Sequence, residues 1–173
     1  MSCKQIPNII TFLNLLCGVL SIINAYDEKH HLAAALILIS SFLDCIDGKI
    51  ACKLNAISHF GKELDSLSDL VSFGVAPAIL AYSAHLKDLE FIGLALTLIY
   101  VMCGAFRLAR FNVKSHKTHF TGLPIPIAGA IIAAVNLVTN TVPIWMFPVL
   151  IVILSALMVS RVKFPSIHTS KPQ

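Results

Sequence analysis

Apolar runs of about 20 residues recur along the chain, and they limit its possible folds more than any other feature of the sequence. Of the 173 residues, 57% are hydrophobic and only 13% are charged, and the mean hydropathy is +0.82. A soluble domain has about 45–50% apolar and about 25% charged residues. A helix needs about 20 apolar residues to cross a bilayer. The sequence therefore predicts an all-α membrane protein, with residues 1–173 forming a single membrane domain.

Six transmembrane helices fit these runs, near residues 6–25, 31–52, 60–82, 89–111, 123–140 and 143–160. If Lys4 is cytoplasmic, six spans leave only Lys29 and Lys87, of the 13 lysines and arginines, on the opposite side. This bias is typical of multi-pass proteins, and we expect an integral protein of the cell's inner or plasma membrane. The net charge of +4 then reflects topology and attraction to anionic lipids, and no nucleic-acid partner is expected.

Four aspartates lie on two neighbouring apolar segments. Asp44 and Asp47 are three residues apart, and Asp65 and Asp69 are four residues apart. Either spacing puts the pair on one face of a helix. If the two faces meet, they form a polar cleft that opens to the cytoplasm. Like charges packed this closely repel unless cations or protons neutralise them. The same stretch carries small residues that leave the backbone accessible: Gly48, Ala51 and Gly61.

Carboxylate oxygens are the ligands that hard cations such as Mg²⁺, Mn²⁺ or Ca²⁺ prefer. The expected cleft contains no sulfur or imidazole that would favour zinc or copper. Two divalent cations would balance four carboxylates and could grip a pyrophosphate. The cleft lies at the depth of lipid head groups, so phosphoryl transfer on a lipid diphosphate fits its charge and place. Gly48 and Ala51 would let a nucleotide approach the helix backbone.

Two further pairs of polar residues lie at the cytoplasmic ends of the expected spans. Asn8 and Thr11 are level with the aspartates, and either cap the first helix, bond to another helix or contact substrate. Arg107 and Arg110 are three residues apart at the end of the fourth span. They either anchor that helix at the membrane surface or form an anion clamp that faces the cleft.

The spacing of these residues resembles a known family signature. Asp44-x-x-Asp47-Gly48-x-x-Ala51, followed after nine residues by Gly61-x-x-x-Asp65-x-x-x-Asp69, is similar to that of the CDP-alcohol phosphatidyltransferase family. The resemblance extends to the members of the family that use serine as the acceptor alcohol. It is carried by four more segments: Pro7-Asn8-x-x-Thr11, Leu64 to Pro77, Arg107-Leu-Ala-Arg110-Phe-Asn112 and Gly122-Leu-Pro-Ile-Pro126.

The resemblance implies six helices, two active-site ions of Mg²⁺ or Mn²⁺ and a homodimer. It also implies CDP-diacylglycerol and L-serine as substrates and CMP as a product. The four aspartates would bind the metals, and Asp69 would also be the general base. Arg107 and Arg110 would clamp serine or phosphate. The residues expected to bind the nucleotide and lipid are Asn8, Thr11, Gly48, Ala51, Gly61 and Lys53.

One position departs from the family pattern, which usually has arginine where this chain has Cys52. Either the next residue, Lys53, partly substitutes for that arginine, or the site is weakened, because lysine cannot reproduce the planar guanidinium fork. Two other functions remain open. The acceptor could be another small alcohol, such as glycerol phosphate or an inositol phosphate, or the aspartates could serve a cation or proton transporter. The glycine and alanine beside the aspartates favour a nucleotide over a bare ion path.

Overall fold

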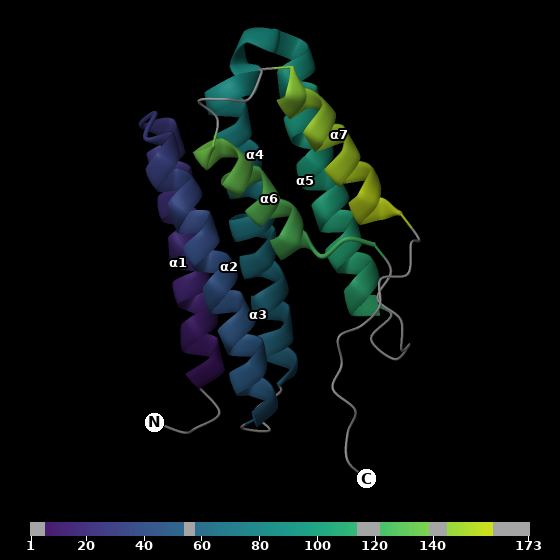
Figure 1. Ribbon diagram of the computed structural model, residues 1–173. Coiled ribbons are helices and arrows are strands. Elements are labelled where there is room, and N and C mark those ends of the chain that lie inside the picture. The colour runs from purple at the N-terminus through teal and green to yellow at the C-terminus, as the bar shows by residue number, and fades with distance from the viewer. Residues whose placement is uncertain (1–5, 54–57, 114–121, 139–144, 161–173) are drawn as a thin grey trace.

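The computed structural model describes residues 6–53, 58–113, 122–138 and 145–160, with the backbone alone at 49–53. Within these ranges all regular structure is helical (Figure 1). The α-helices are α1 (Ile6–Tyr26), α2 (His30–Lys53), α3 (His59–Asp69), α4 (Ala76–Ala81), α5 (Glu90–Val113), α6 (Ile125–Leu137) and α7 (Met146–Val159). Three short segments of other helix types connect α3, α4 and α5: the π-helices η2 (Leu70–Val75) and η3 (Tyr82–Leu86) and the 3₁₀-helix η4 (Lys87–Leu89).

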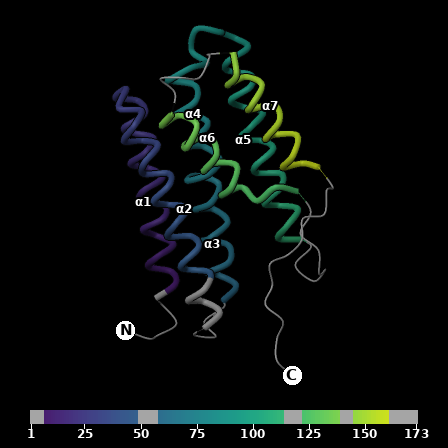
Figure 2. The backbone as a smooth tube through the Cα atoms, in the orientation of Figure 1, coloured from purple at the N-terminus to yellow at the C-terminus, as the bar shows by residue number. Residues whose placement is uncertain are grey.

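The chain forms two long hairpins that lie side by side (Figures 1 and 2). The first is made by α1 and α2, which turn at residues 27–29. The second rises through α3, η2, α4 and η3 and returns through α5. Both hairpins turn at the same end of the bundle, and each turn has one residue with a positive φ, Glu28 at 60° and Glu90 at 46°. The start of α1, the end of α2, the start of α3 and the end of α5 therefore meet at the other end.

Small side chains let these helices pack closely. The alanines at contacts between helices are fully buried, namely Ala33, Ala34, Ala76, Ala78, Ala81, Ala128 and Ala133. Between them lie a few large side chains that are also completely buried, including Phe73, Tyr100, Ile132 and Phe147. Helix α6 crosses the bundle obliquely and packs on α2 and η2, and α7 packs on α5 (Figure 1). The buried core therefore draws side chains from α1, α2, η2, α4, η3, α5, α6 and α7.

Large apolar side chains cover the outside of the bundle, for example Phe42 (68% exposed), Phe91 (85%) and Met102 (69%). Such a surface suits lipid contact rather than water. Three segments are long and apolar enough to cross a membrane: Pro7–Tyr26, His30–Gly48 and the 55-residue stretch His59–Val113, which contains both legs of the second hairpin. Helices α6 and α7 have 13 and 14 residues, fewer than the roughly 20 that a span needs. The all-α class is confirmed for the described residues, and the six-span count remains a prediction.

Candidate active site

A cavity of about 660 Å³ lies at the end of the bundle where the two hairpins begin and end. Cavities that bind small molecules have volumes of about 300–1,000 Å³, so there is room for a nucleotide or a lipid head group. Helices α1, α2, α3 and α5 each contribute to its wall. The residues that line it are Pro7, Asn8, Thr11, Asp44, Asp47, Gly48, Ser58, Gly61, Lys62, Asp65, Ser66, Asp69, Arg107, Leu108, Phe111, Pro124 and Pro126.

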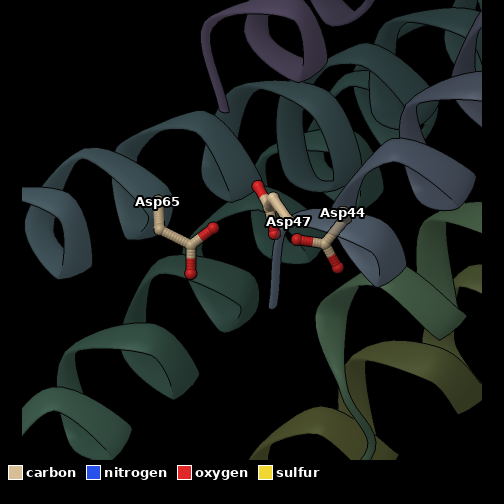
Figure 3. Close-up of side chains that lie close together, drawn as sticks. All are labelled: Asp44, Asp47 and Asp65. Atoms are coloured by element: carbon tan, nitrogen blue, oxygen red, sulfur yellow. The ribbon is translucent and has the colours of Figure 1, made fainter. Parts of the chain in front are cut away.

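Three carboxylates converge in this cavity (Figure 3). Asp44 and Asp47 come from α2, and Asp65 comes from α3. Each offers an oxygen atom, and these oxygens all lie within 4.8 Å of one another. Two oxygens on opposite sides of a Mg²⁺ ion, each about 2.1 Å from it, are about 4.2 Å apart. The 4.8 Å bound exceeds this separation by only about 0.6 Å, so small side-chain movements would let the three aspartates share one hard divalent cation.

Asp69 completes the acidic group from one helical turn deeper. It is 8% exposed and lines the same cavity as Asp44, Asp47 and Asp65. Among the described residues, nothing forms a hydrogen bond with its Oδ1 atom. A buried oxygen without a partner is costly, and four acidic groups in one cavity repel one another. Both observations fit a site for divalent cations, whose charge would satisfy these oxygens.

Serine hydroxyls fix α3 and η2 against α1 and so bring the two pairs of aspartates together. Ser68 Oγ donates to the backbone oxygen of Thr11 at 3.2 Å, and Ser72 Oγ donates to that of Asn14 at 3.1 Å. The close approach also needs Gly18, because a Cβ there would come within 2.8 Å of the Cα of Ser72. These contacts set both the distance and the register between the helices.

The two arginines that share a predicted anion clamp are separated in the structure. Arg107 is 9% exposed and lines the cavity; its Nε has no hydrogen-bond partner among the described residues, and its Cζ lies 6.0 Å from the ring centroid of Phe111. Arg110 does not line the cavity. Its guanidinium donates at 3.2 Å to the backbone oxygens of Val159 and Ser160, at the end of α7. Side chains three residues apart on a helix point in directions that differ by about 60° around the helix axis. That difference lets Arg107 face the cavity while Arg110 bonds to the end of α7.

The residues predicted to contact the nucleotide divide into two groups. Asn8, Thr11, Gly48 and Gly61 line the cavity. Thr11 Oγ1 donates to Asp47 Oδ2 at 3.2 Å, and a Cβ at Gly48 would have no neighbouring atom within 4 Å. Gly48 therefore borders open space in the cavity. The second group, Ala51 and Lys53, lies outside the described side chains, as does Cys52.

Three polar residues that the sequence analysis did not select also line the cavity: Ser58, Lys62 and Ser66. Ser58 caps α3 by accepting from the amide of Gly61 at 2.9 Å. Ser66 accepts at 3.0 Å from Asn112 Nδ2, which ties α3 to the end of α5. Their spacing of four residues puts them on one helix face beside Asp65, and this periodicity is the signal that would have identified them.

An apolar helical bundle that gathers four carboxylates and a buried arginine around one cavity fits the class of membrane enzymes that act on phosphate esters. The chain belongs to the CDP-alcohol phosphatidyltransferase family, which its residues 4–162 match. It is 45% identical over 167 residues to the CDP-diacylglycerol–serine O-phosphatidyltransferase of Bacillus subtilis (strain 168), covering 94% of this chain and 90% of that protein.

Two relatives from other organisms have names that describe the same kind of enzyme. The archaetidylserine synthase of Methanothermobacter thermautotrophicus is 39% identical over 165 residues, which cover 94% of this chain and 70% of that protein. The CDP-diacylglycerol–serine O-phosphatidyltransferase of Helicobacter pylori (strain 26695) is 35% identical over 174 residues, which cover 95% of this chain and 73% of that protein. All three relatives are named as enzymes that act with serine or make a serine lipid.

Proposed function

We propose that this protein transfers the phosphatidyl group of CDP-diacylglycerol to L-serine and releases phosphatidylserine and CMP. One observation carries the proposal: four aspartates and a buried arginine surround a single cavity in an apolar bundle. The chain is also similar over nearly its full length to enzymes named for this reaction. The charge and size of the cavity fit a substrate with a diphosphate, a nucleotide and an acyl-bearing end.

We propose that Asp44, Asp47, Asp65 and Asp69 hold two divalent cations, Mg²⁺ or Mn²⁺. Their oxygen-only donor set favours hard cations, and the convergence of three of them within 4.8 Å supports a shared site. When bound, such ions neutralise charge on the diphosphate and stabilise the charge that develops in the transition state. Thr11 keeps Asp47 oriented through its hydrogen bond to Oδ2.

Asp69 is the general base of the proposed reaction. Its unpartnered Oδ1 accepts the proton of the serine hydroxyl. The serine oxygen then forms a bond to the phosphorus on the lipid side. The bond from that phosphorus to the bridging oxygen breaks, and CMP leaves with the electron pair. Arg107 holds an anionic group beside the reacting atoms, either a phosphate or the serine carboxylate, and its planar guanidinium suits both.

The cavity faces the cytoplasm in this proposal. Of the lysines and arginines among the described residues, Lys29 and Lys87 lie at the end remote from the cavity, and the other five lie in the half of the bundle that contains it. This distribution supports placing the cavity on the cytoplasmic side, and six spans remain part of the proposal. On the family resemblance, we also propose a homodimer. Labelling of single cysteines placed at residues 28 and 58 from either side of sealed vesicles tests the orientation. Chemical cross-linking in membranes tests the homodimer.

CMP release from CDP-diacylglycerol by the purified protein tests the reaction, with L-serine, glycerol 3-phosphate and inositol phosphate supplied in turn. We expect release with serine and a phosphatidylserine product on chromatography. Release with another alcohol alone would change the acceptor, and cation or proton flux in proteoliposomes without CMP release would favour a transporter. The Asp69→Asn protein is the control, since an amide cannot accept the hydroxyl proton at neutral pH.

A further inference from the structure

The helix that carries Asp65 and Asp69 changes its winding directly after Asp69. Residues Leu70–Val75 form the π-helix η2, in which the amide of Ala76 donates to the carbonyl oxygen of Val71, five residues earlier. Each residue of an α-helix turns the chain by about 100°, so one extra residue in a turn rotates everything on one side of it by that angle. The geometry of η2 therefore sets the direction in which the acidic face of α3 points.

A proline explains why η2 needs a hydrogen-bond donor from another helix. Pro77, just after η2, has no N–H, so it can donate neither to the carbonyl oxygen of Phe73, its partner in an α-helix, nor to that of Ser72, its partner in a π-helix. The hydroxyl of Tyr100 on α5 donates to the Phe73 oxygen at 3.1 Å. Tyr100 is fully buried. In apolar surroundings a freed carbonyl must find a donor, and a neighbouring helix supplies it here.

Two other helices hold the same turn. Gly129 of α6 packs against Phe73 so closely that a Cβ would lie 3.0 Å from both its Cα and its backbone oxygen. From the residue before Phe73, Ser72 Oγ donates to the carbonyl oxygen of Asn14 on α1. The π turn is thus confined by α1, α5 and α6 together. Phe73, which accepts from Tyr100, is four residues, about one helical turn, from Asp69.

We propose that Tyr100 is a positioning residue for the metal-binding aspartates. Its hydroxyl replaces the amide that Pro77 lacks and so keeps η2 in the winding that turns Asp65 and Asp69 toward Asp44. Tyr100 does not line the cavity and touches no reacting atom. The inference rests on the proposed function for its link to catalysis, but its effect on metal binding can be measured without any substrate.

The test is Tyr100→Phe, which removes one oxygen atom and keeps the ring. Mn²⁺ binding to the purified full-length protein is measured by electron paramagnetic resonance, and kcat and KM are measured in parallel. Residues that support metal ligands are typically worth about 10–100-fold in affinity or activity, and we expect about 10-fold weaker Mn²⁺ binding. We also expect a lower kcat, with the KM for CDP-diacylglycerol changed by less than about twofold.

Thr97→Val is the matched control. Thr97 is also buried on α5, but its hydroxyl donates at 2.8 Å to Gly93 of the same helix and, within the described part of the chain, is bonded to no other element. It should bind Mn²⁺ like the native protein. Gly129→Ala is a second variant, which presses on Phe73 from α6 and should also weaken Mn²⁺ binding.

Native Mn²⁺ affinity in Tyr100→Phe would overturn the proposal, and so would failure of that variant to fold, since Tyr100 would then serve folding rather than positioning. Equal losses in Thr97→Val would count against it as well. The proposed function fails separately: if the native protein binds Mn²⁺ but releases no CMP with any alcohol, the reaction is wrong while the role of Tyr100 stands.

Discussion

Replacing Asp47 with asparagine should change stability in opposite directions with and without metal. Asp47 is 5% exposed, and its oxygen lies within 4.8 Å of oxygens from both Asp44 and Asp65. Asparagine keeps the shape and can still accept the hydrogen bond from Thr11. Without metal, the substitution removes two like-charge contacts. With metal, it removes a charged ligand.

The size of the effect follows from the 4.8 Å spacing. Two unit charges at this distance repel by about 0.9 kcal/mol in bulk water and by about 3.5 kcal/mol at an effective dielectric constant of 20. Taken at the lower value and at the 4.8 Å bound, relief from two contacts is about 1.7 kcal/mol. A protein of this length changes its Tm by about 2–4 °C for each kcal/mol, so Asp47→Asn should melt about 3–7 °C higher in EDTA.

Scanning fluorimetry of the detergent-purified protein measures the Tm in EDTA and in saturating Mn²⁺. In saturating Mn²⁺ the order should reverse, because a ligand at 100 times its Kd stabilises the native protein by about 2.7 kcal/mol, and the variant loses most of this. Asp27→Asn is the control, since Asp27 is an exposed aspartate that pairs with Lys29 at the remote end of the bundle. A lower Tm for Asp47→Asn in EDTA would refute the idea that these carboxylates repel one another.

Three further outcomes are expected. Asp69→Asn should lower kcat by about 10²–10⁴-fold while CDP-diacylglycerol still binds, and residual activity above about a tenth would remove Asp69 from the role of base. Excess EDTA should abolish CMP release, with recovery in Mg²⁺ or Mn²⁺ but poor recovery in Zn²⁺, and full activity in EDTA would contradict a metal-dependent reaction. Arg107→Lys should impair turnover or KM, because lysine lacks the planar fork, whereas Arg110→Lys should act mainly on Tm through the end of α7; the reverse pattern in the kinetic assay would exchange their roles.

The sequence predicts most of the helices because hydrophobic length is a local property. The first four predicted spans correspond to α1, to α2, to the α3–η3 leg and to α5, with ends that differ by a few residues. The last two are described as shorter helices, of 13 and 14 residues. The switch to π-helix after Asp69 could not be predicted, because it depends on the donors and the space that α1, α5 and α6 provide.

Part of the site was also predictable, because helix periodicity, like hydrophobic length, is a local property of the sequence. The four aspartates, Asn8, Thr11, Gly48, Gly61 and Arg107 all line the cavity, since helix periodicity places each on a defined face. The separation of Arg110 from Arg107 was not predictable from periodicity. It depends on where α7 ends, and that position is set by tertiary packing on α5.

The four aspartates repel one another, so something other than their own attraction must assemble the cavity. Three hydroxyl groups do this from both sides of α1: Ser68 and Ser72 reach its backbone from α3 and η2, and Ser40 from α2. Each of these serines is buried. Ser68 donates to the carbonyl oxygen of Thr11, whose side chain bonds to Asp47, and Ser40 and Ser72 donate to that of Asn14, about one turn further along α1. In an apolar environment such bonds between helices resist exchange with water. The scaffold thus holds the carboxylates at their spacing before any cation binds, and the repulsion stored there favours cation binding.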